Sequence, residues 1–131
     1  MAQPSYEKIS LKDLEKIPNI FSDIARENAF QCYNKDKNKP AQLRQFYDEL
    51  VMWDEKISSG NEQFARALPF IQMMRAKVAY SFGRGKVTKE FRDMFDRVIS
   101  QIDSEETLRH AKLFMEAFMG YLKYRSATGN E

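Results

Sequence analysis

The chain has 131 residues, of which 43% are hydrophobic and 31% charged, values typical of one globular domain and unlike those of a disordered chain. Its formal net charge is +2, and it contains only 5 Gly and 4 Pro. So few turn-forming residues favour helices over an all-β fold. There is no run of about 18 apolar residues, so we expect no membrane-spanning segment.

The N-terminal sequence MAQPSYEKISLKDLEKI lacks the cationic start and apolar centre of a secretory signal peptide. A single cysteine, Cys32, cannot form an internal disulfide, which fits a reducing compartment. We therefore expect a cytoplasmic protein.

The first predicted helix begins at Ser10, a good N-cap residue, with Ile9 and Leu14 spaced as a hydrophobic staple. Pro18 interrupts it, because the residue before a proline is disfavoured in a helix. A second helix is predicted over residues 21–32 from a helical period of apolar and small residues.

The polar stretch NKDKNK, residues 34–39, has no periodicity and is predicted to be a loop. Pro40 suits the first turn of the third helix, which Ser58-Ser59-Gly60-Asn61 ends. The apolar stripe of this helix consists of Leu43, Phe46, Tyr47, Leu50 and Ile57.

Asn61 is expected to cap the fourth helix, with a break or a new first turn at Pro69 and a stop at Gly83. Its expected buried stripe is Leu68, Ile71, Met74, Val78 and Phe82.

Thr88 is a good N-cap for the fifth helix, and Asp103 with Glu106 forms an acidic version of the capping box before the last one. The core residues expected in these two helices are Phe91, Met94, Phe95, Val98, Ile99, Ile102, Leu108, Ala111, Met115, Phe118 and Leu122. The pattern predicts an all-α, single-domain bundle of about five main helices plus a short N-terminal helix.

Catalytic and metal sites are not indicated. His110 is the only histidine, which excludes a two-histidine metal site within one chain, and it is expected on a helix surface. Adjacent carboxylates such as Asp48 and Glu49 point to different faces of a helix. GRGKVT, residues 83–88, lacks the Walker spacing and follows a helix. We therefore expect no enzyme, no metal and no cofactor.

Basic residues gather in two stretches: residues 35–44 carry four against one acid, and residues 75–92 carry six against one acid. Residues 48–62 and 93–106 each carry five acids against one cation. Separate basic and acidic surfaces suit a chain that binds a polyanion while contacting protein neighbours. Solvation of helix faces by charges of both signs is equally consistent with these counts.

Lys77, Tyr80 and Arg84 fall within about 60° of one another at about 100° per residue, away from the apolar stripe. Gly83 and Gly85 leave backbone amides unshielded, so that a phosphate could approach. These features suit a sugar-phosphate backbone, which is bound without regard to base sequence. Tyr80 would stack or hydrogen-bond there, or pack at the bundle edge.

Four strings in this order resemble the small subunit of type III-A CRISPR effector complexes, the Csm complex. They are PAQLRQFYDEL (40–50), LPFIQMMRAKVAYSFGRGKV (68–87), EFRDMFDRVI (90–99) and AFMGYLKY (117–124). The resemblance covers about residues 38–125 of one helical domain. Residues 1–37 match no motif, and the polar tail, residues 126–131, is expected to fray.

The resemblance implies an all-helical subunit without catalytic activity that takes part in antiviral defence. Its partners would be guide RNA, target RNA, other subunits of the complex and stacked copies of itself, while neighbouring subunits cleave RNA and DNA. The RNA-backbone contacts carried over are Arg44, Lys77, Arg84 and Lys86, with Lys37 and Lys39 as further candidates.

A different class of function also fits: a helical protein-interaction module whose basic face binds an acidic partner. Arg75 lies near the apolar stripe and is expected to extend over the core or pair with an acid. Acidic residues such as Asp48 or Asp93 would face neighbouring copies or simply be solvated.

Overall fold

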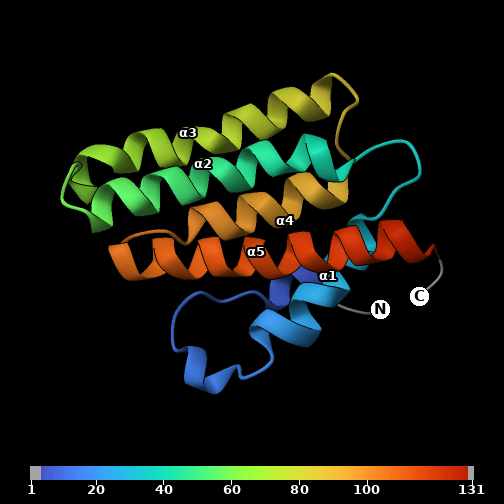
Figure 1. The fold of residues 1–131 in the computed structure, drawn as a ribbon, viewed down its shortest axis with the longest axis horizontal. Coiled ribbons are helices and arrows are strands. Elements are labelled where there is room, and N and C mark those ends of the chain that lie inside the picture. Colours follow the sequence, from blue (N-terminus) through green and yellow to red (C-terminus); the bar gives the residue numbers. More distant parts are fainter. Residues whose placement is uncertain (1–3, 130–131) are drawn as a thin grey trace.

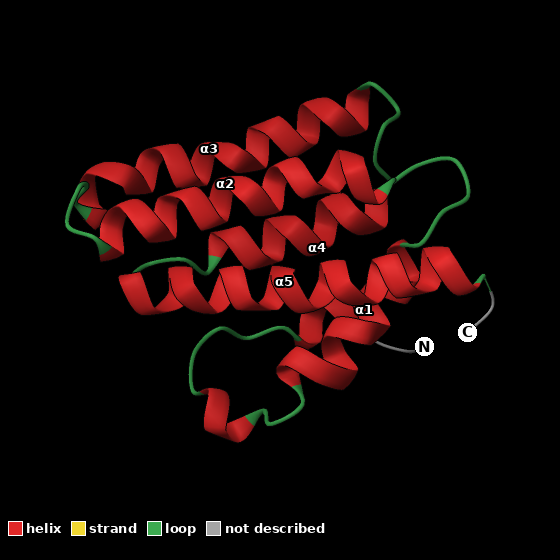
Figure 2. Cartoon of the chain, in the orientation of Figure 1, coloured by secondary structure: helices red, strands yellow, loops and turns green. Residues whose placement is uncertain are grey.

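The computed structural model describes residues 4–129, and within that range every element of regular secondary structure is helical, which confirms the all-α single domain (Figures 1 and 2). Three short turns come first: 3-10 turns at Ser5–Lys8 and Leu14–Lys16 and a π turn at Ile20–Ile24. The α-helices are α1 (Ala25–Cys32), α2 (Pro40–Ser58), α3 (Phe64–Gly83), α4 (Lys89–Ser100) and α5 (Glu105–Thr128). None of these helices is long and apolar enough to cross a membrane.

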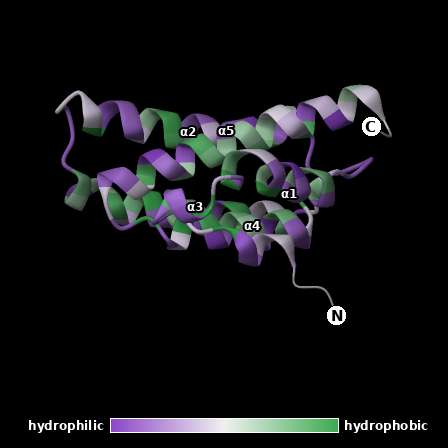
Figure 3. Ribbon diagram, turned by 90° about the horizontal axis from the view of Figure 1, so that it is seen from below, coloured by the Kyte–Doolittle hydropathy of each residue, from purple (hydrophilic) through white to green (hydrophobic). Residues whose placement is uncertain are grey.

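The bundle has two layers, with α2 beside α5 in one and α3 beside α4 in the other, while α1 packs on α5 (Figure 3). Phenylalanines join the layers: the ring centroid of Phe91 lies 6.0 Å from Phe46, 5.5 Å from Phe95 and 5.9 Å from Phe118. Each buried Phe stabilises the fold by roughly 1.5–3 kcal/mol. This central cluster therefore fixes how α2, α4 and α5 sit around it.

The predicted stripes are mostly buried, as expected. Tyr47 and Leu68 are only half-buried, and Phe82 is 36% exposed, with the Arg92 guanidinium 4.5 Å from its ring centroid. Phe82 lies in the last turn of α3, and its ring is covered by Arg92 rather than by the core. Its prediction as a core residue is therefore wrong.

Several helix ends were predicted correctly. Pro40 is in the first turn of α2, and Gly60 follows its end with a positive φ of +83°. Thr88 caps α4, its hydroxyl accepting a hydrogen bond from the Phe91 amide at 3.3 Å. Glu105 and Glu106 lie in the first turn of α5, where the positive end of the helix dipole stabilises their negative charges.

Other helix ends differ from prediction. Gln63, rather than Asn61, precedes α3, and Pro69 lies inside that helix without a break. Ser104, rather than Asp103, caps α5 in a reciprocal capping box with Thr107. The last helix also continues through Thr128, so residues 126–128 are helical; residues 130 and 131 lie outside the described residues.

The helix predicted from Ser10 is wrong. Ile9 and Leu11 are both fully buried, an alternation that an irregular extended segment allows and a helix does not. Asp13 then adopts a left-handed conformation with φ +53°, and only Leu14–Lys16 make a helical turn.

Side chains from α4, from the residue after it and from α5 form hydrogen bonds to the backbone of residues 9–11, which lies outside any helix. The Gln101 amide accepts from the Leu11 N–H at 2.8 Å and donates to the Ile9 carbonyl at 2.9 Å. Arg97 Nε donates to the same carbonyl at 3.0 Å, and His110 Nδ1 lies 2.7 Å from the Leu11 carbonyl oxygen. Because that oxygen can only accept, Nδ1 carries the proton. His110 thus has a structural partner and is half-buried rather than a free surface residue.

Candidate nucleic-acid interface

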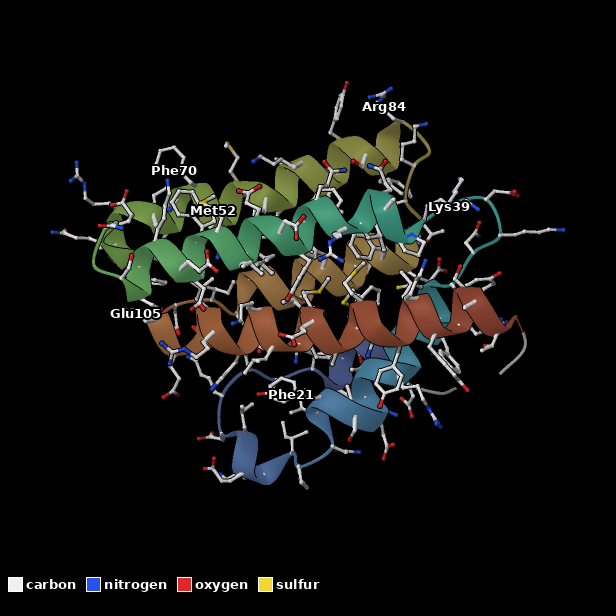
Figure 4. All side chains as sticks on the ribbon, viewed as in Figure 1. Phe21, Lys39, Met52, Phe70, Arg84 and Glu105 are labelled. Carbon is white, nitrogen blue, oxygen red and sulfur yellow. The ribbon has the colours of Figure 1, made fainter. Side chains whose placement is uncertain are left out.

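Asn38 joins the two basic stretches of the sequence at one end of the bundle. It is only 2% exposed, and its side chain donates to the Cys32 carbonyl and to Thr88 Oγ1, both at 2.7 Å. Its amide oxygen accepts from the Thr88 N–H at 2.9 Å, and its own N–H donates to the Lys86 carbonyl at 3.1 Å. The 34–39 loop is therefore fastened to the turn between α3 and α4, and Lys39 and Arg84 lie at the same end (Figure 4).

The turn after α3 ends the helix through Gly85. Gly85 has φ +76°, its N–H donates to the Phe82 carbonyl at 3.0 Å, and the Lys86 N–H donates to the Ser81 carbonyl at 2.9 Å. This pair of bonds is a Schellman motif with Gly85 as the left-handed residue. The helix thus ends at Gly83, where the stop was predicted, but the left-handed residue of the motif is Gly85. The motif presents Arg84 and Lys86 on either side of Gly85.

A groove runs from this turn between α2 and α3. Lys77, Tyr80 and Arg84 line it from α3, and Gln42, Gln45 and Glu49 from α2. Tyr80 is 67% exposed, and the Arg84 guanidinium lies 5.7 Å from its ring centroid, within cation–π range. The expected grouping of Lys77, Tyr80 and Arg84 on one side of α3 is thus present in the structure.

The cations of this region differ in their partners. Lys77 Nζ lies 2.9 Å from Glu49 Oε1, and the other oxygen of that carboxylate accepts from the Trp53 indole at 3.2 Å. Within residues 4–129, Lys37, Arg84 and Lys86 form no ion pair, and the Lys39 ammonium donates to the Lys35 carbonyl at 2.6 Å. The loop and turn therefore present cations without an ion-pair partner, with Asp36 as the one acid of the loop, whereas Lys77 is partly neutralised.

Arg44 lies elsewhere. It lines a depression between α2 and α5 together with Tyr47, Glu116 and Lys123, and its Nε is 3.7 Å from Asp48 Oδ1. Five of the six predicted RNA-contact residues therefore gather at one end and along one groove, and Arg44 does not join them.

Two further side chains are accounted for by the fold. Arg75 forms a two-pronged contact with Asp96 at 2.7 and 3.2 Å, which raises the pKa of Arg75, so the expected pairing with an acid is confirmed. Burial raises the pKa of the Cys32 thiol well above its usual value and keeps it protonated. In the described part of the chain, no three His, Cys, Asp or Glu side chains gather as a metal site.

Sequence reasoning missed Asn38 and the glutamines of the groove. An Asn before Lys-Pro was a usable signal, since Asn tolerates the left-handed region better than most residues. Its partner Thr88 is 50 positions away, so the clamp itself had no local signal.

The family comparison bears directly on this arrangement. The family model described as Csm2 Type III-A matches residues 15–128 of the chain. The chain belongs to this family. The match includes residues 15–37, for which the sequence motifs had offered no relative.

Membership places this Csm2 protein in the type III-A CRISPR Csm complex, as its structural small subunit with the other subunits as partners. No curated protein and no solved structure matched the chain.

Proposed function

We propose that this Csm2 subunit is a non-catalytic scaffold that binds the backbones of guide and target RNA without sequence specificity. The binding surface is the basic end, which we define as Lys37, Lys39, Arg84 and Lys86, extended along the α2–α3 groove by Lys77. The Asn38 clamp carries this proposal, because it holds two basic segments together that helix packing alone would leave separate.

The chemistry of the basic end suits phosphodiesters. Lysine and arginine neutralise phosphates and release counterions, so that affinity falls steeply as salt rises. If about four phosphates are contacted, the slope of log K against log salt is about −3 for a single strand. The side-chain amides of the half-buried Gln42 and the exposed Gln45 add donors for phosphate or sugar oxygens.

In the complex, copies of the chain would stack head to tail along the RNA in the cytoplasm. The exposed Glu55 on α2 is available to a cation of a neighbouring copy, as is Asp48 if it leaves Arg44. Such stacking would repeat the basic end at a regular interval along the guide.

The test is a double charge reversal, Arg84→Glu with Lys86→Glu, titrated with guide RNA and guide–target duplex in the reconstituted complex and as the free subunit. We expect about a 30- to 100-fold loss of affinity at low salt, a smaller salt slope and an unchanged melting temperature. Arg66→Glu, at the far end of α3, is the matched control and should change RNA affinity little. Full RNA affinity in the double variant would contradict the proposal.

Glu49→Gln sharpens the test because it removes the carboxylate that competes with phosphate for Lys77. RNA affinity should rise about two- to fivefold, consistent with the modest strength of a partly exposed ion pair. A fall in affinity would show that the Lys77–Glu49 pair positions the groove rather than opposing the RNA.

An acidic protein partner is the second candidate, favoured by one observation. Phe70 and Met73 are 54% and 48% exposed on α3, and Phe70 stacks on Trp53 with centroids 6.2 Å apart. An apolar patch of this kind near basic residues is common in protein interfaces. If RNA bound at low salt but did not crosslink at Lys77, Arg84 or Lys86, that result would favour the acidic protein partner.

A further inference from the structure

Among the large apolar side chains of residues 4–129, Tyr80 is the most exposed, at 67%. In this range its hydroxyl forms no hydrogen bond, and the only cation–π or aromatic contact of its ring is with the Arg84 guanidinium. Phe70, about three turns earlier on α3, differs, because its ring stacks on Trp53. The fold therefore gives Phe70 a packing partner and leaves most of Tyr80 in solvent.

The neighbours of Tyr80 along α3 are cations. Lys77 lies one turn before it and Arg84 one turn after it, and Figure 4 shows Arg84 projecting from the end of the helix. With a rise of 1.5 Å per residue, these two cations are about 10 Å apart along the helix axis, and the tyrosine ring lies between them. A polyanion that follows α3 would place its phosphates at the cations. The group that links two phosphates would lie at the ring, and in RNA this group is a nucleoside.

The wall of the groove opposite Tyr80 carries amides. Gln42 and Gln45 line it from α2, and the Gln45 amide donates to the Gln42 backbone carbonyl at 3.0 Å. Within residues 4–129 the Gln42 side chain forms no hydrogen bond. A glutamine amide offers both donors and an acceptor, so it can bond to the edge of any base. This wall therefore suits a base without selecting one.

The carboxylate of Glu49 decides which part of a nucleotide enters the groove. It lies on the same wall as the glutamines, only 19% of its side chain is exposed, and it pairs with Lys77. A carboxylate in this position repels a phosphate but not a neutral base. The phosphates therefore belong on the open side, at Arg84 and Lys86, and the base belongs inside.

We propose that the α2–α3 groove binds one unpaired nucleotide of RNA, with its base stacked on Tyr80. The edge of the base faces the amides of Gln42 and Gln45. The phosphates on either side of it lie at Arg84 and Lys86. The inference rests on the proposed RNA-binding function and deepens it, because it names the state of the RNA at this point. A base inside a duplex is already stacked and paired, so it does not reach the ring.

An unpaired nucleotide fits this end of the groove better than an apolar protein segment does. Such a segment laid on Tyr80 would cover Arg84 and leave it without a counter-charge, which is costly. A nucleotide supplies the counter-charge and the stacking partner together. Stacking on an aromatic ring also tolerates every base, as binding without sequence specificity requires.

The test compares a single-stranded RNA of about 12 nucleotides with the blunt duplex of the same length, titrated against the full chain at equal salt. Charge alone would favour the duplex, whose charge density is higher. Wild-type protein should nevertheless bind the single strand more tightly. Tyr80→Ala should lose about tenfold of the affinity for the single strand and less than twofold for the duplex, so that the preference reverses.

Two conservative variants separate stacking from other contacts of Tyr80. Tyr80→Phe should keep the preference for the single strand, because the ring remains. Tyr80→Leu should lose it, because an apolar side chain without a ring does not stack. The fluorescence of 2-aminopurine in the single strand should be quenched by wild-type protein and by Tyr80→Phe, and much less by Tyr80→Leu. All three variants should melt at the wild-type temperature, since the side chain is exposed.

Phe70→Ala is the matched control, because it removes an exposed ring of α3 that does not line the groove. It should leave the preference and the quenching unchanged. The proposal is wrong if Tyr80→Ala weakens both RNAs equally, or if Tyr80→Phe loses as much affinity as Tyr80→Ala, since the hydroxyl would then be the contact.

Failure of this proposal is distinguishable from failure of the RNA-binding function. Arg84→Glu with Lys86→Glu should weaken the binding of both RNAs. If that double variant did so while Tyr80→Ala changed neither affinity, the RNA-binding function would stand and the base site would be excluded. Full affinity of the double variant for both RNAs would overturn the two proposals together.

Discussion

Two irregular segments of this chain, residues 9–13 and 34–39, are both fixed by side-chain hydrogen bonds, but from opposite directions. Residues 9–13 receive their bonds: the side chains of Gln101, which follows α4, and of His110 on α5 bond to their backbone. The 34–39 loop supplies its own, because Asn38 reaches from it to Cys32 and Thr88.

The difference follows from what each segment contributes. Residues 9–13 bury Ile9 and Leu11 in the core, so their bonds satisfy backbone groups that burial removes from water. The 34–39 loop keeps its lysines exposed and buries only Asn38. Its bonds position charge rather than apolar surface. Disrupting the first segment should therefore change stability alone, and disrupting the second should change both stability and RNA binding.

The largest effect is expected for Asn38→Ala. It removes the side-chain bonds to Cys32 and Thr88 and places alanine at φ +53°, which together should lower the free energy of unfolding by about 3 kcal/mol. RNA affinity of the folded protein should also fall severalfold, because Lys37 and Lys39 are no longer held beside Lys86. Urea denaturation and RNA titration measure the two effects.

Asn38→Gly is the matched variant, since glycine accepts the positive φ without strain. It should recover about 1 kcal/mol of the loss and none of the RNA affinity. Wild-type stability in both variants would show that the clamp is not what holds the loop.

A smaller effect is expected for Gln101→Leu. The Leu11 N–H would be left without its acceptor in a buried segment, which should destabilise the fold by about 2 kcal/mol. RNA affinity of the folded fraction should not change. Gln31→Leu, an exposed substitution on α1, controls for the chemistry of the replacement. Loss of RNA affinity at equal folded fraction would contradict the division between the two segments.

The sequence predicted the parts of the fold that depend on neighbouring residues. The stripe from Phe91 to Ile99, the Thr88 cap and the turn after Ser58 are local patterns, and each is found in the structure. The extended segment at Ile9 could not be predicted, because its hydrogen-bond partners lie 88 to 99 positions along the chain. The local pattern favoured a helix from Ser10, but burial of both Ile9 and Leu11 requires an extended backbone there.

The candidate site divides in the same way. The spacing of Lys77 and Arg84 predicted that they share one face of a helix, and both line the same groove in the structure. The position of Arg44 was not, because which side of α2 faces α3 and which faces α5 depends on the packing of all three helices. The sequence therefore identified the basic residues, but only the folded structure shows which of them lie together.

The smallest effect concerns the exposed Lys12–Asp103 pair, which joins the first segment to the start of α5. A hydrogen bond from Lys12 lowers the pKa of Asp103, and the same bond raises the pKa of Lys12. The carboxylate therefore adds stability above its unfolded pKa of about 3.9 and loses it as the pH falls through the lower folded value. Lys12→Met should lower the melting temperature slightly at pH 7 and leave it unchanged near pH 2.

Lys16→Met, which breaks no ion pair, controls for the added apolar side chain. If Lys12→Met lowered the melting temperature equally at both pH values, the Lys12 methylenes rather than its charge would hold the segment. Because both side chains of the pair are exposed, salt should weaken it as acid does. The buried amide bonds of Gln101 should respond to neither, so pH and salt separate the surface attachment of residues 9–13 from the buried one.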